Sequence, residues 1–337
     1  MIHRTATAWQ TPEWQRVLKD GFTQVDELIE YLDLDRQLLP AARAAASEFS
    51  LKVPREFAAL IEKGNLDDPI LRQILPLSDE LLPQQGFSRD PVGDLATEVV
   101  PGVLHKYHGR VLLVATGACG INCRYCFRRH YPYSDSFAGR DQWRQALEYL
   151  QDNSEVKEVI LSGGDPLILP DHQLATLIHS LGKVPHLQRL RIHSRLPVIV
   201  PQRLTPELTN QLAGSHLHST LVLHINHTAE ISNQLVRGLS PLRANGVTLL
   251  NQSVLLRGVN DNSELLISLS EKLFEAGVLP YYLHLLDRVE GAAHFEVQES
   301  HAIKLHEILR RRLPGYLVPK LVRESAGEKS KSPVCDF

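Results

Sequence analysis

The chain has 337 residues, 43% of them hydrophobic and 22% charged, with a formal net charge of -3. This composition is typical of a soluble globular protein, and the length allows either two ordinary domains or one α/β barrel with an appendage. A surface that binds nucleic acid or an anionic membrane needs an excess of basic residues, which this chain lacks. No stretch approaches the roughly 18 apolar residues of a membrane span, and the first residues lack the apolar run of a signal peptide. We therefore expect a cytosolic protein that binds neither nucleic acid nor a membrane.

Residues 1–104 predict a helical extension, because they show helical patterns and no strand pattern up to about residue 100. The clearest helical segment, residues 52–65, has Pro54 at a suitable first position and Gly64 where the helix can end. Its apolar side chains recur at helical spacing: Phe57, Leu60 and Ile61. A loop rich in Pro, Gly and Asp follows over residues 77–101.

Residues 105–290 predict a β/α core, because short β-branched runs alternate there with amphipathic stretches. The predicted strands are residues 110–116, 158–163, 187–194, 219–225, 248–256 and 280–286. The predicted helices between them are residues 140–151, 172–182, 205–214, 230–246 and 262–277. Thr205 can cap one helix, and Gly246 and Gly277 can end two others just before a strand.

Six β/α repeats imply parallel strands joined by crossover helices. Because six strands are two short of a complete barrel, we predict an α/β fold with a partial (β/α)6 TIM-like barrel that is open on one side. A doubly wound sheet is the rival arrangement. Residues 291–337 should add a C-terminal helix and a short C-terminal segment.

Three of the four cysteines fall in the loop after the first predicted strand, within GACGINCRYCFRRHY. In a reducing compartment, clustered cysteines more often bind metal or act in catalysis than form a disulfide. Cys119, Cys123 and Cys126 can hold an iron-sulfur cluster or a zinc ion. Zinc needs a fourth protein ligand, from Cys335 or a histidine, whereas a cluster with three protein ligands leaves one iron open for a small molecule. Buried thiols without metal are the third alternative.

The Cys-x3-Cys-x2-Cys spacing after the first strand, with an aromatic residue before the last cysteine, resembles the radical S-adenosylmethionine enzymes. In that family the cysteines hold a 4Fe-4S cluster whose open iron binds S-adenosylmethionine, which is cleaved to a 5'-deoxyadenosyl radical. The segment SGGDPL after the second strand strengthens the resemblance, since glycines allow a close approach of the backbone. The resemblance implies contacts with S-adenosylmethionine from Gly163, Gly164, Asp165, His224 and Gln252.

Longer segments narrow the resemblance to lysine 2,3-aminomutase over residues 50–337. They are HKYHGRVLLVATGACGINCRYCFRRHY, RIHSRLPVIVPQRLTPEL, HINH, GVTLLNQSVLLRGVND and YYLHLLDRVEGAAHF. These enzymes also hold pyridoxal 5'-phosphate as a Schiff base on a lysine near the C-terminus, which corresponds to Lys331. The family's Gly-rich run has become AGEKS in this chain, so Lys329 is a competing candidate. Schiff-base chemistry requires an unprotonated amine, and therefore a lysine inside an assembled site.

The resemblance also implies the substrate contacts. Arg128 would hold the substrate carboxylate with its bidentate guanidinium fork. Asp287, with Glu324 where the family has a second aspartate, would pair with the distal ammonium. Because a glutamate side chain would need a cation or a neutral donor opposite it, this acidic pair favours lysine as the substrate. The candidates for the phosphate of pyridoxal phosphate are Lys106, Tyr107 and Arg110.

The chain most resembles a short bacterial branch of the family that supplies (R)-β-lysine for the modification of translation elongation factor P. That branch implies a functional link to elongation factor P and its lysyl ligase. It also implies an electron donor such as flavodoxin or ferredoxin. Whether the protein forms a homo-oligomer is left open. Longer family members carry additional zinc ligands, and Asn262 stands at one of their positions, so we expect no zinc.

Two alternatives remain open from the sequence. The first is a radical enzyme of the same architecture that acts on another amino acid or on a lysine already attached to a protein. The second is a structural zinc-binding or interaction protein whose cysteines stabilise a loop. A brown colour that bleaches in air would indicate an iron-sulfur cluster and exclude the second alternative.

Overall fold

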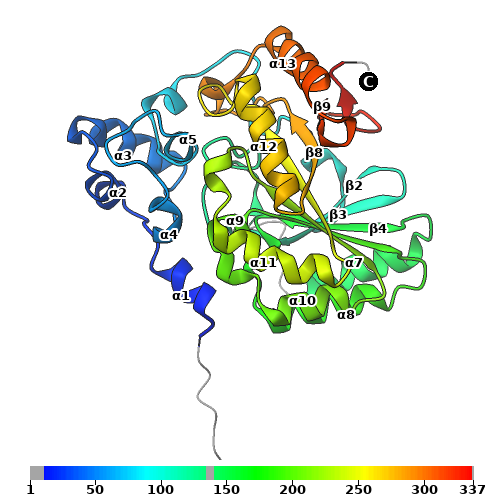
Figure 1. The fold of residues 1–337 in the computed structure, drawn as a ribbon. Coiled ribbons are helices and arrows are strands. Elements are labelled where there is room, and N and C mark those ends of the chain that lie inside the picture. The colour runs from blue at the N-terminus through cyan, green and yellow to red at the C-terminus, as the bar shows by residue number, and fades with distance from the viewer. Residues whose placement is uncertain (1–10, 134–139, 336–337) are drawn as a thin grey trace, which may run out of the picture.

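Six parallel strands form the centre of the computed structural model, which describes residues 11–133 and 140–335. They are β3 (Arg110–Thr116), β4 (Glu158–Gly163), β5 (Arg189–Ser194), β6 (His218–His224), β7 (Thr248–Val254) and β8 (Leu279–His284). Each pairs in parallel with the next. Helices cover the outer face of the curved sheet (Figure 1). The prediction of a partial barrel is confirmed, with strand bounds that differ from the predicted ones by at most two residues.

The helices that connect the strands also follow the prediction. They are α7 (Arg140–Asp152), α8 (Asp171–Gly182), α10 (Pro206–Ala213), α11 (Asn233–Ala244) and α12 (Ser263–Glu275), and α13 (Glu299–Arg312) comes after the barrel. The Thr205 hydroxyl accepts a hydrogen bond from the Leu208 N–H at 3.1 Å, as a helix cap should. Gly246 and Gly277 have φ values of 82° and 77°, the left-handed conformation that ends a helix.

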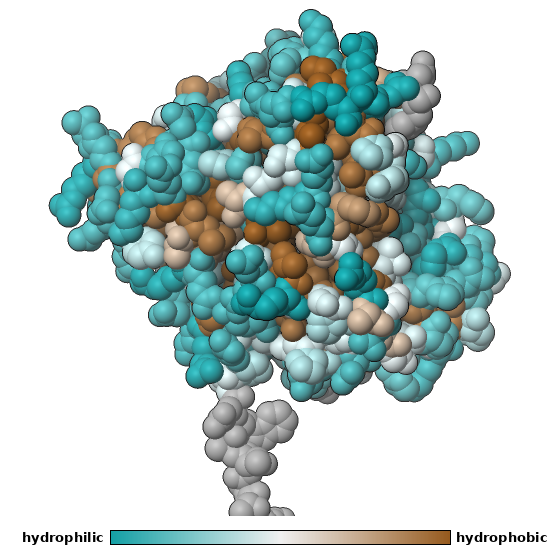
Figure 2. Space-filling model, viewed as in Figure 1, coloured by the Kyte–Doolittle hydropathy of each residue, from teal (hydrophilic) through white to brown (hydrophobic). Residues whose placement is uncertain are grey.

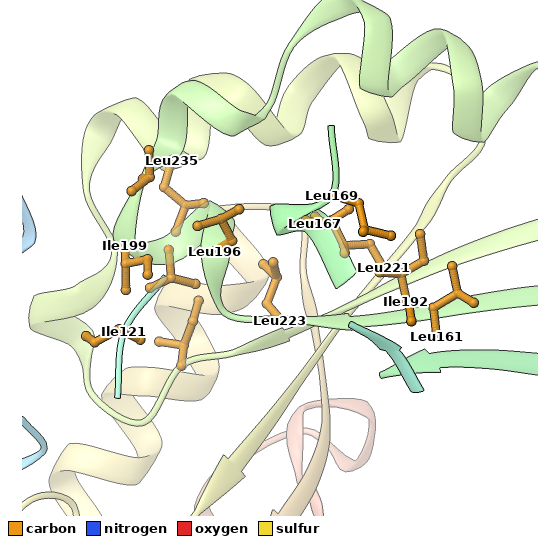
Figure 3. Close-up of a cluster of buried hydrophobic side chains, with 14 of the residues drawn as sticks. Ile121, Leu161, Leu167, Leu169, Ile192, Leu196, Ile199, Leu221, Leu223 and Leu235 are labelled. Carbon is orange, nitrogen blue, oxygen red and sulfur yellow. The ribbon is translucent and has the colours of Figure 1, made fainter. Parts of the chain in front are cut away.

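Leucine and isoleucine side chains join the sheet to its helices (Figure 3). Leu161, Ile192 and Leu223 come from three neighbouring strands, and Leu235 comes from α11. Ile121, in the cysteine loop, belongs to the same buried cluster. The loop that carries the cysteines is therefore anchored in the main core.

Short strands extend both edges of the sheet beyond the prediction. β1 (Glu98–Val100) and β2 (Val103–Tyr107) continue it antiparallel from β3, and β9 (Lys320–Arg323) and β10 (Ser332–Pro333) continue it from β8. The expectation of no strand before residue 100 is wrong at β1. Such short segments carry no periodicity of their own, and their strand conformation depends on the neighbouring edge.

The N-terminal part folds as short helices beside the barrel (Figure 1). They are α1 (Glu13–Lys19), α2 (Val25–Tyr31), α3 (Leu39–Glu48), α4 (Arg55–Ala58) and α5 (Pro69–Arg72). The helix predicted over residues 52–65 is wrong, because α4 is a single turn. The Glu62 N–H donates to the Asp68 carboxylate at 3.0 Å and the Gly64 N–H donates to the Leu32 carbonyl at 2.8 Å, so tertiary acceptors replace the helical ones.

Single 3₁₀ turns complete the backbone. They are η1 (Arg36–Leu38), η2 (Ser78–Leu81), η3 (Leu95–Thr97), η4 (Pro166–Ile168), η5 (Pro201–Arg203), η6 (Thr228–Glu230), η7 (Ala293–Phe295) and η8 (Gly315–Leu317), and a short α9 (Leu196–Ile199) follows β5. Within the described ranges, no helix has both the length and the apolar character to cross a membrane. Figure 2 shows one face covered mostly by hydrophilic side chains, with hydrophobic ones between them.

Candidate functional site

The cysteine loop follows β3 and brings its three thiols close enough together for the charge of one to shift the pKa of another. Burial is the main cause that raises the pKa of Cys119 well above its usual value, and the charges of Cys126, Asp165 and Cys123 add to the shift. Burial raises the pKa of Cys126 to about 11. The described residues contain no group of three or more ligand side chains arranged around one metal ion. A 4Fe-4S cluster differs in that each thiolate binds a different iron, and a donor set of three nearby thiols fits it.

A buried carboxylate of η2 holds the cysteine loop. Glu80 accepts hydrogen bonds from Arg124 at 2.8 and 2.6 Å and from Arg129 at 2.7 Å. The Arg124 side chain is fully buried and also donates to the Phe49 carbonyl at 2.7 Å. Arg129, which has no role in the sequence analysis, therefore has a structural one. The side chain of His130 lies on the surface, with Nε2 3.3 Å from the Glu290 carbonyl oxygen.

Arg195, which follows β5, contacts the cysteine loop, and the sequence analysis missed it. Its Nη1 donates to the Cys123 sulfur at 2.7 Å, and its Nη2 donates to Gln73 and Glu230 at 2.8 Å each. Burial by itself lowers the pKa of Arg195, but the neighbouring negative groups raise it by a larger amount. The net shift is upward, so the guanidinium stays charged. A cation this close to a ligating sulfur stabilises the thiolate that a cluster requires. The only sequence signal was the position of this residue directly after a strand.

The Gly-Gly-Asp turn after β4 lies directly against the cysteine loop. Gly163 has a φ of 106°, and a Cβ on Gly164 would lie 2.3 Å from the Ala118 carbonyl oxygen, so neither position accepts a side chain. Asp165 uses its carboxylate internally. It accepts from the Ser194 hydroxyl at 2.6 Å and from the backbone N–H groups of Leu167, Arg195 and Leu196. The N–H groups of Gly164 and Asp165 donate to the Thr116 and Ala118 carbonyls, so the turn offers a ligand chiefly the carbonyl groups of its backbone.

Neutral histidines line the interior at the ends of the strands. His224 Nε2 lies 2.9 Å from Gln252 Nε2, so the structure brings together the two residues predicted to contact S-adenosylmethionine. Burial lowers the pKa of His224 to about 3, and His193 stacks edge-on against it at 5.9 Å. The Nε2 atoms of His193 and His284 are buried without a hydrogen-bond partner among the described residues. Buried polar atoms are normally paired, so these fit an interior that receives a polar ligand.

A line of alternating charges crosses the same interior. Arg128 donates from Nε to Asp94 at 2.7 Å and from Nη1 to the Ser162 hydroxyl at 3.1 Å. Lys106 bridges Asp94 at 2.5 Å and Glu324 at 3.1 Å, and Glu324 also bonds to the Lys331 amine. The two lysines hold the pKa of Glu324 at about 2 against the effect of burial. Asp94 is a second residue that the sequence analysis missed, because its loop looks like an ordinary turn.

Asp287 lies beside this line without joining it. Burial, followed by the charge of Glu324, raises the pKa of Asp287 to about 7, and Lys331 opposes the shift. No hydrogen bond to its carboxylate is found within residues 11–133 and 140–335. A carboxylate in this state gains more than an ordinary one from an incoming cation.

Lys331 and Lys329 occupy different environments. The Lys331 amine bonds to Glu324 and lies 5.9 Å from the ring centre of Tyr282, whereas Lys329 is exposed. Tyr107 is next to Glu324, since burial and that carboxylate raise the pKa of its hydroxyl. The Arg110 guanidinium lies 4.7 Å above the Tyr107 ring. Lys331, Tyr107 and Arg110 thus share one part of the interior.

Cys335 and Asn262, the two other positions considered in relation to zinc, lie away from the cysteine loop. Cys335 Sγ is 3.2 Å from His306 Nδ1 on α13, inside a separate hydrophobic cluster. Asn262 caps α12 by accepting from the Glu264 N–H at 2.8 Å. Neither residue lies in the cysteine loop or in the charged line.

Comparisons with known proteins agree with this geometry. A sequence profile of the Radical SAM superfamily matches residues 113–269, which include the cysteine loop. The L-lysine 2,3-aminomutase of Escherichia coli (strain K12) is 50% identical over 96% of this chain and 94% of its own length. The chain belongs to the L-lysine 2,3-aminomutase family. The aminomutases of Haemophilus influenzae, 48% identical over 95% of this chain and 94% of that protein, and Clostridium subterminale, 35% identical over 97% and 78%, extend the match.

Membership of the radical S-adenosylmethionine aminomutases implies a 4Fe-4S cluster and S-adenosylmethionine. The three thiols, the close Gly-Gly turn and the cation at Cys123 all fit that pair of cofactors.

Substituting Gly164→Ala should prevent cluster assembly, because its new Cβ must displace the backbone carbonyl of Ala118 one residue before Cys119. After anaerobic reconstitution, we expect iron content and the visible absorption of the cluster to fall to a small fraction of the wild-type values. The matched control is Gly315→Ala, whose Cβ would meet nothing within 4 Å. Equal cluster loading of the two variants would contradict the assigned contact.

Proposed function

We propose that this aminomutase uses S-adenosylmethionine, a 4Fe-4S cluster and pyridoxal 5'-phosphate to move the amino group of L-lysine from C2 to C3, giving β-lysine. The observation that carries the proposal is the grouping of Arg128, Asp287 and Lys331 in one interior beside the cysteine loop. These three side chains match the carboxylate, the distal ammonium and the cofactor that the reaction requires.

Arg128 is suited to the substrate carboxylate. A guanidinium has five N–H donors, and Asp94 and Ser162 take two of them, so three remain for a bidentate contact. Burial by itself lowers the pKa of Arg128, but the charge of Asp94 raises it by a larger amount. The net shift is upward, and the side chain stays a cation. The carboxylate would therefore meet a charged and oriented partner.

Asp287 is suited to the distal ammonium of lysine. Glu324 already bonds to two lysines, whereas the Asp287 carboxylate has no such bond among the described residues. Engagement of the Lys331 amine by a cofactor would release one oxygen of Glu324 to join Asp287. An acidic pair at this end of the site excludes a substrate with a second carboxylate.

Lys331 is suited to hold pyridoxal phosphate, with Arg110 and Tyr107 near its phosphate. Lys106 is less available for that phosphate, because its three N–H donors already meet Asp94, Glu324 and the Val92 carbonyl at 2.9 Å. The bound cofactors supply the radical that takes a hydrogen atom and the carbonyl carbon that carries the migrating nitrogen. The protein positions the substrate between them, and the burial of the site limits the access of water.

The finer proposal concerns the product and its use. We place (R)-β-lysine as the product, serving modification of translation elongation factor P through its lysyl ligase, with a flavodoxin or ferredoxin as electron donor in the cytoplasm. The motifs NLDDPILRQIL, HSRLPVIVP and VNDN, shared with the short bacterial branch of the family, support this proposal.

An anaerobic assay tests the function directly. The reconstituted protein, with S-adenosylmethionine, pyridoxal phosphate, reductant and L-lysine, should form β-lysine, and chiral chromatography should identify the R form. Absence of both β-lysine and 5'-deoxyadenosine from a cluster-loaded sample would overturn the proposal. Turnover of another amino acid in place of lysine would assign the same chemistry to a different substrate.

Borohydride reduction of the pyridoxal-loaded protein should locate the cofactor. We expect mass spectrometry to find the pyridoxyl group on Lys331, because its amine lies inside the site whereas Lys329 is exposed. The variant Lys331→Ala should take up no cofactor, and the matched variant Lys329→Ala should load as the wild type does. A label on Lys329 would refute the assignment.

The KM for lysine should rise as the pH falls through about 7, because Asp287 has a pKa of about 7 and its protonated form does not attract an ammonium. Removing one partner of a buried charge pair costs about 2–5 kcal/mol, so Asp287→Asn should raise KM at least about 30-fold at pH 8. Asp67→Asn, at a side chain that is 82% exposed, is the control. Unchanged lysine turnover in Asp287→Asn would show that the ammonium binds elsewhere.

A further inference from the structure

Asp94 is buried between two cations that come from different parts of the chain. Its side chain is 3% exposed; one oxygen meets Arg128 Nε at 2.7 Å and the other meets Lys106 Nζ at 2.5 Å. Burial by itself raises the pKa of Asp94, but the two cations lower it by a larger amount. The net shift is downward, so the carboxylate is ionised. Asp94 and Arg128 also line a cavity of about 240 Å³, together with Phe127 and His130.

The backbone around Asp94 is itself held in place. The Asp90 carboxylate accepts from the N–H groups of Asp94 at 2.9 Å and Leu95 at 3.1 Å. Gly93 has a φ of 67°, and a Cβ there would lie 3.0 Å from the Ala326 side chain. The segment of residues 90–97 therefore contacts the C-terminal part, while Asp94 reaches the cysteine loop. The carboxylate has little freedom to move.

Asp94 connects the two ends of the proposed substrate site. Through Arg128 it fixes the group for the substrate carboxylate. Through Lys106 it leads to Glu324, which lies beside Asp287 at the end for the distal ammonium. Without Asp94, Arg128 would lose its only carboxylate bond among the described residues, and Lys106 would keep Glu324 as its one carboxylate partner there.

We propose that Asp94 is a positioning residue for lysine: it orients the Arg128 guanidinium toward the substrate carboxylate and offsets the positive charge of Lys106, so that the potential around Glu324 and Asp287 stays negative and attracts the ammonium. The inference rests on the proposed function. Asp94 itself touches neither the reacting atoms nor a cofactor.

A purely structural role would give a different pH dependence. The charged groups that face Asp287 are Glu324, Lys331, Asp94 and Lys106. Because the charge of Asp94 raises the pKa of Asp287, its loss should move the pH at which lysine binding weakens to a lower value. A loop that is only loosened would weaken binding at every pH and leave that midpoint in place.

The test compares Asp94→Asn with Asp67→Asn, the same change at a side chain that is 82% exposed. Lysine binding is measured by calorimetry from pH 6 to 9 on the cluster-loaded and pyridoxal-loaded protein without S-adenosylmethionine, so that no turnover occurs. KM and kcat are then measured with all components. Misplacement of a positioned group costs on the order of 10- to 100-fold, so we expect Asp94→Asn to weaken lysine binding and raise KM by that factor, with a smaller loss in kcat. Asp67→Asn lies outside the proposed site and should stay near wild type.

Each outcome decides a separate point. Wild-type binding of lysine with a weakened Asp94→Asn variant and a midpoint moved to lower pH supports the inference. Equal binding by wild type and Asp94→Asn, or an equal loss in Asp67→Asn, overturns it and leaves the proposed function intact. Failure of the wild type to bind lysine would instead reject the proposed substrate. Asp94→Glu, which keeps the charge, distinguishes misfolding from lost charge, because it should retain the wild-type pH midpoint.

Discussion

The contact of Glu80 with Arg124 and Arg129 determines where the cluster can sit. Three buried hydrogen bonds join one carboxylate in the N-terminal part to two guanidinium groups in the cysteine loop. Burying such charges is costly unless every partner is in place, so this arrangement tolerates little displacement. The N-terminal helices are thus part of the site, since they turn a surface loop after β3 into a fixed support for three thiols.

Charges of alternating sign cross the interior, which suits the proposed binding of a zwitterionic substrate. Arg128, Asp94, Lys106, Glu324 and Lys331 alternate in sign along one line. The histidines at the ends of β5, β6 and β8 are neutral because burial lowers their pKa values. A buried interior with paired charges favours oriented binding of a zwitterion and limits the access of water.

The barrel was predictable because its signals are local. Strands β3 to β8 are apolar runs bounded by turns, and Thr205, Gly246 and Gly277 mark helix ends through their own backbone chemistry. The single-turn α4 was mispredicted because the Glu62 and Gly64 N–H groups find partners distant in sequence. The short strands β1, β2, β9 and β10 were missed because two to five residues are too few to show a strand periodicity.

By itself, the sequence determined the cysteine spacing, the Gly-Gly turn and the family, since these depend on residue type at fixed intervals. Only the tertiary structure decided which charges meet. It separated the half-buried Lys331 from the exposed Lys329 and occupied the Asp165 carboxylate with backbone donors. It also placed Asp94, from an ordinary-looking loop, between Arg128 and Lys106. Burial and pairing arise from elements far apart in the chain, so no local pattern encodes them.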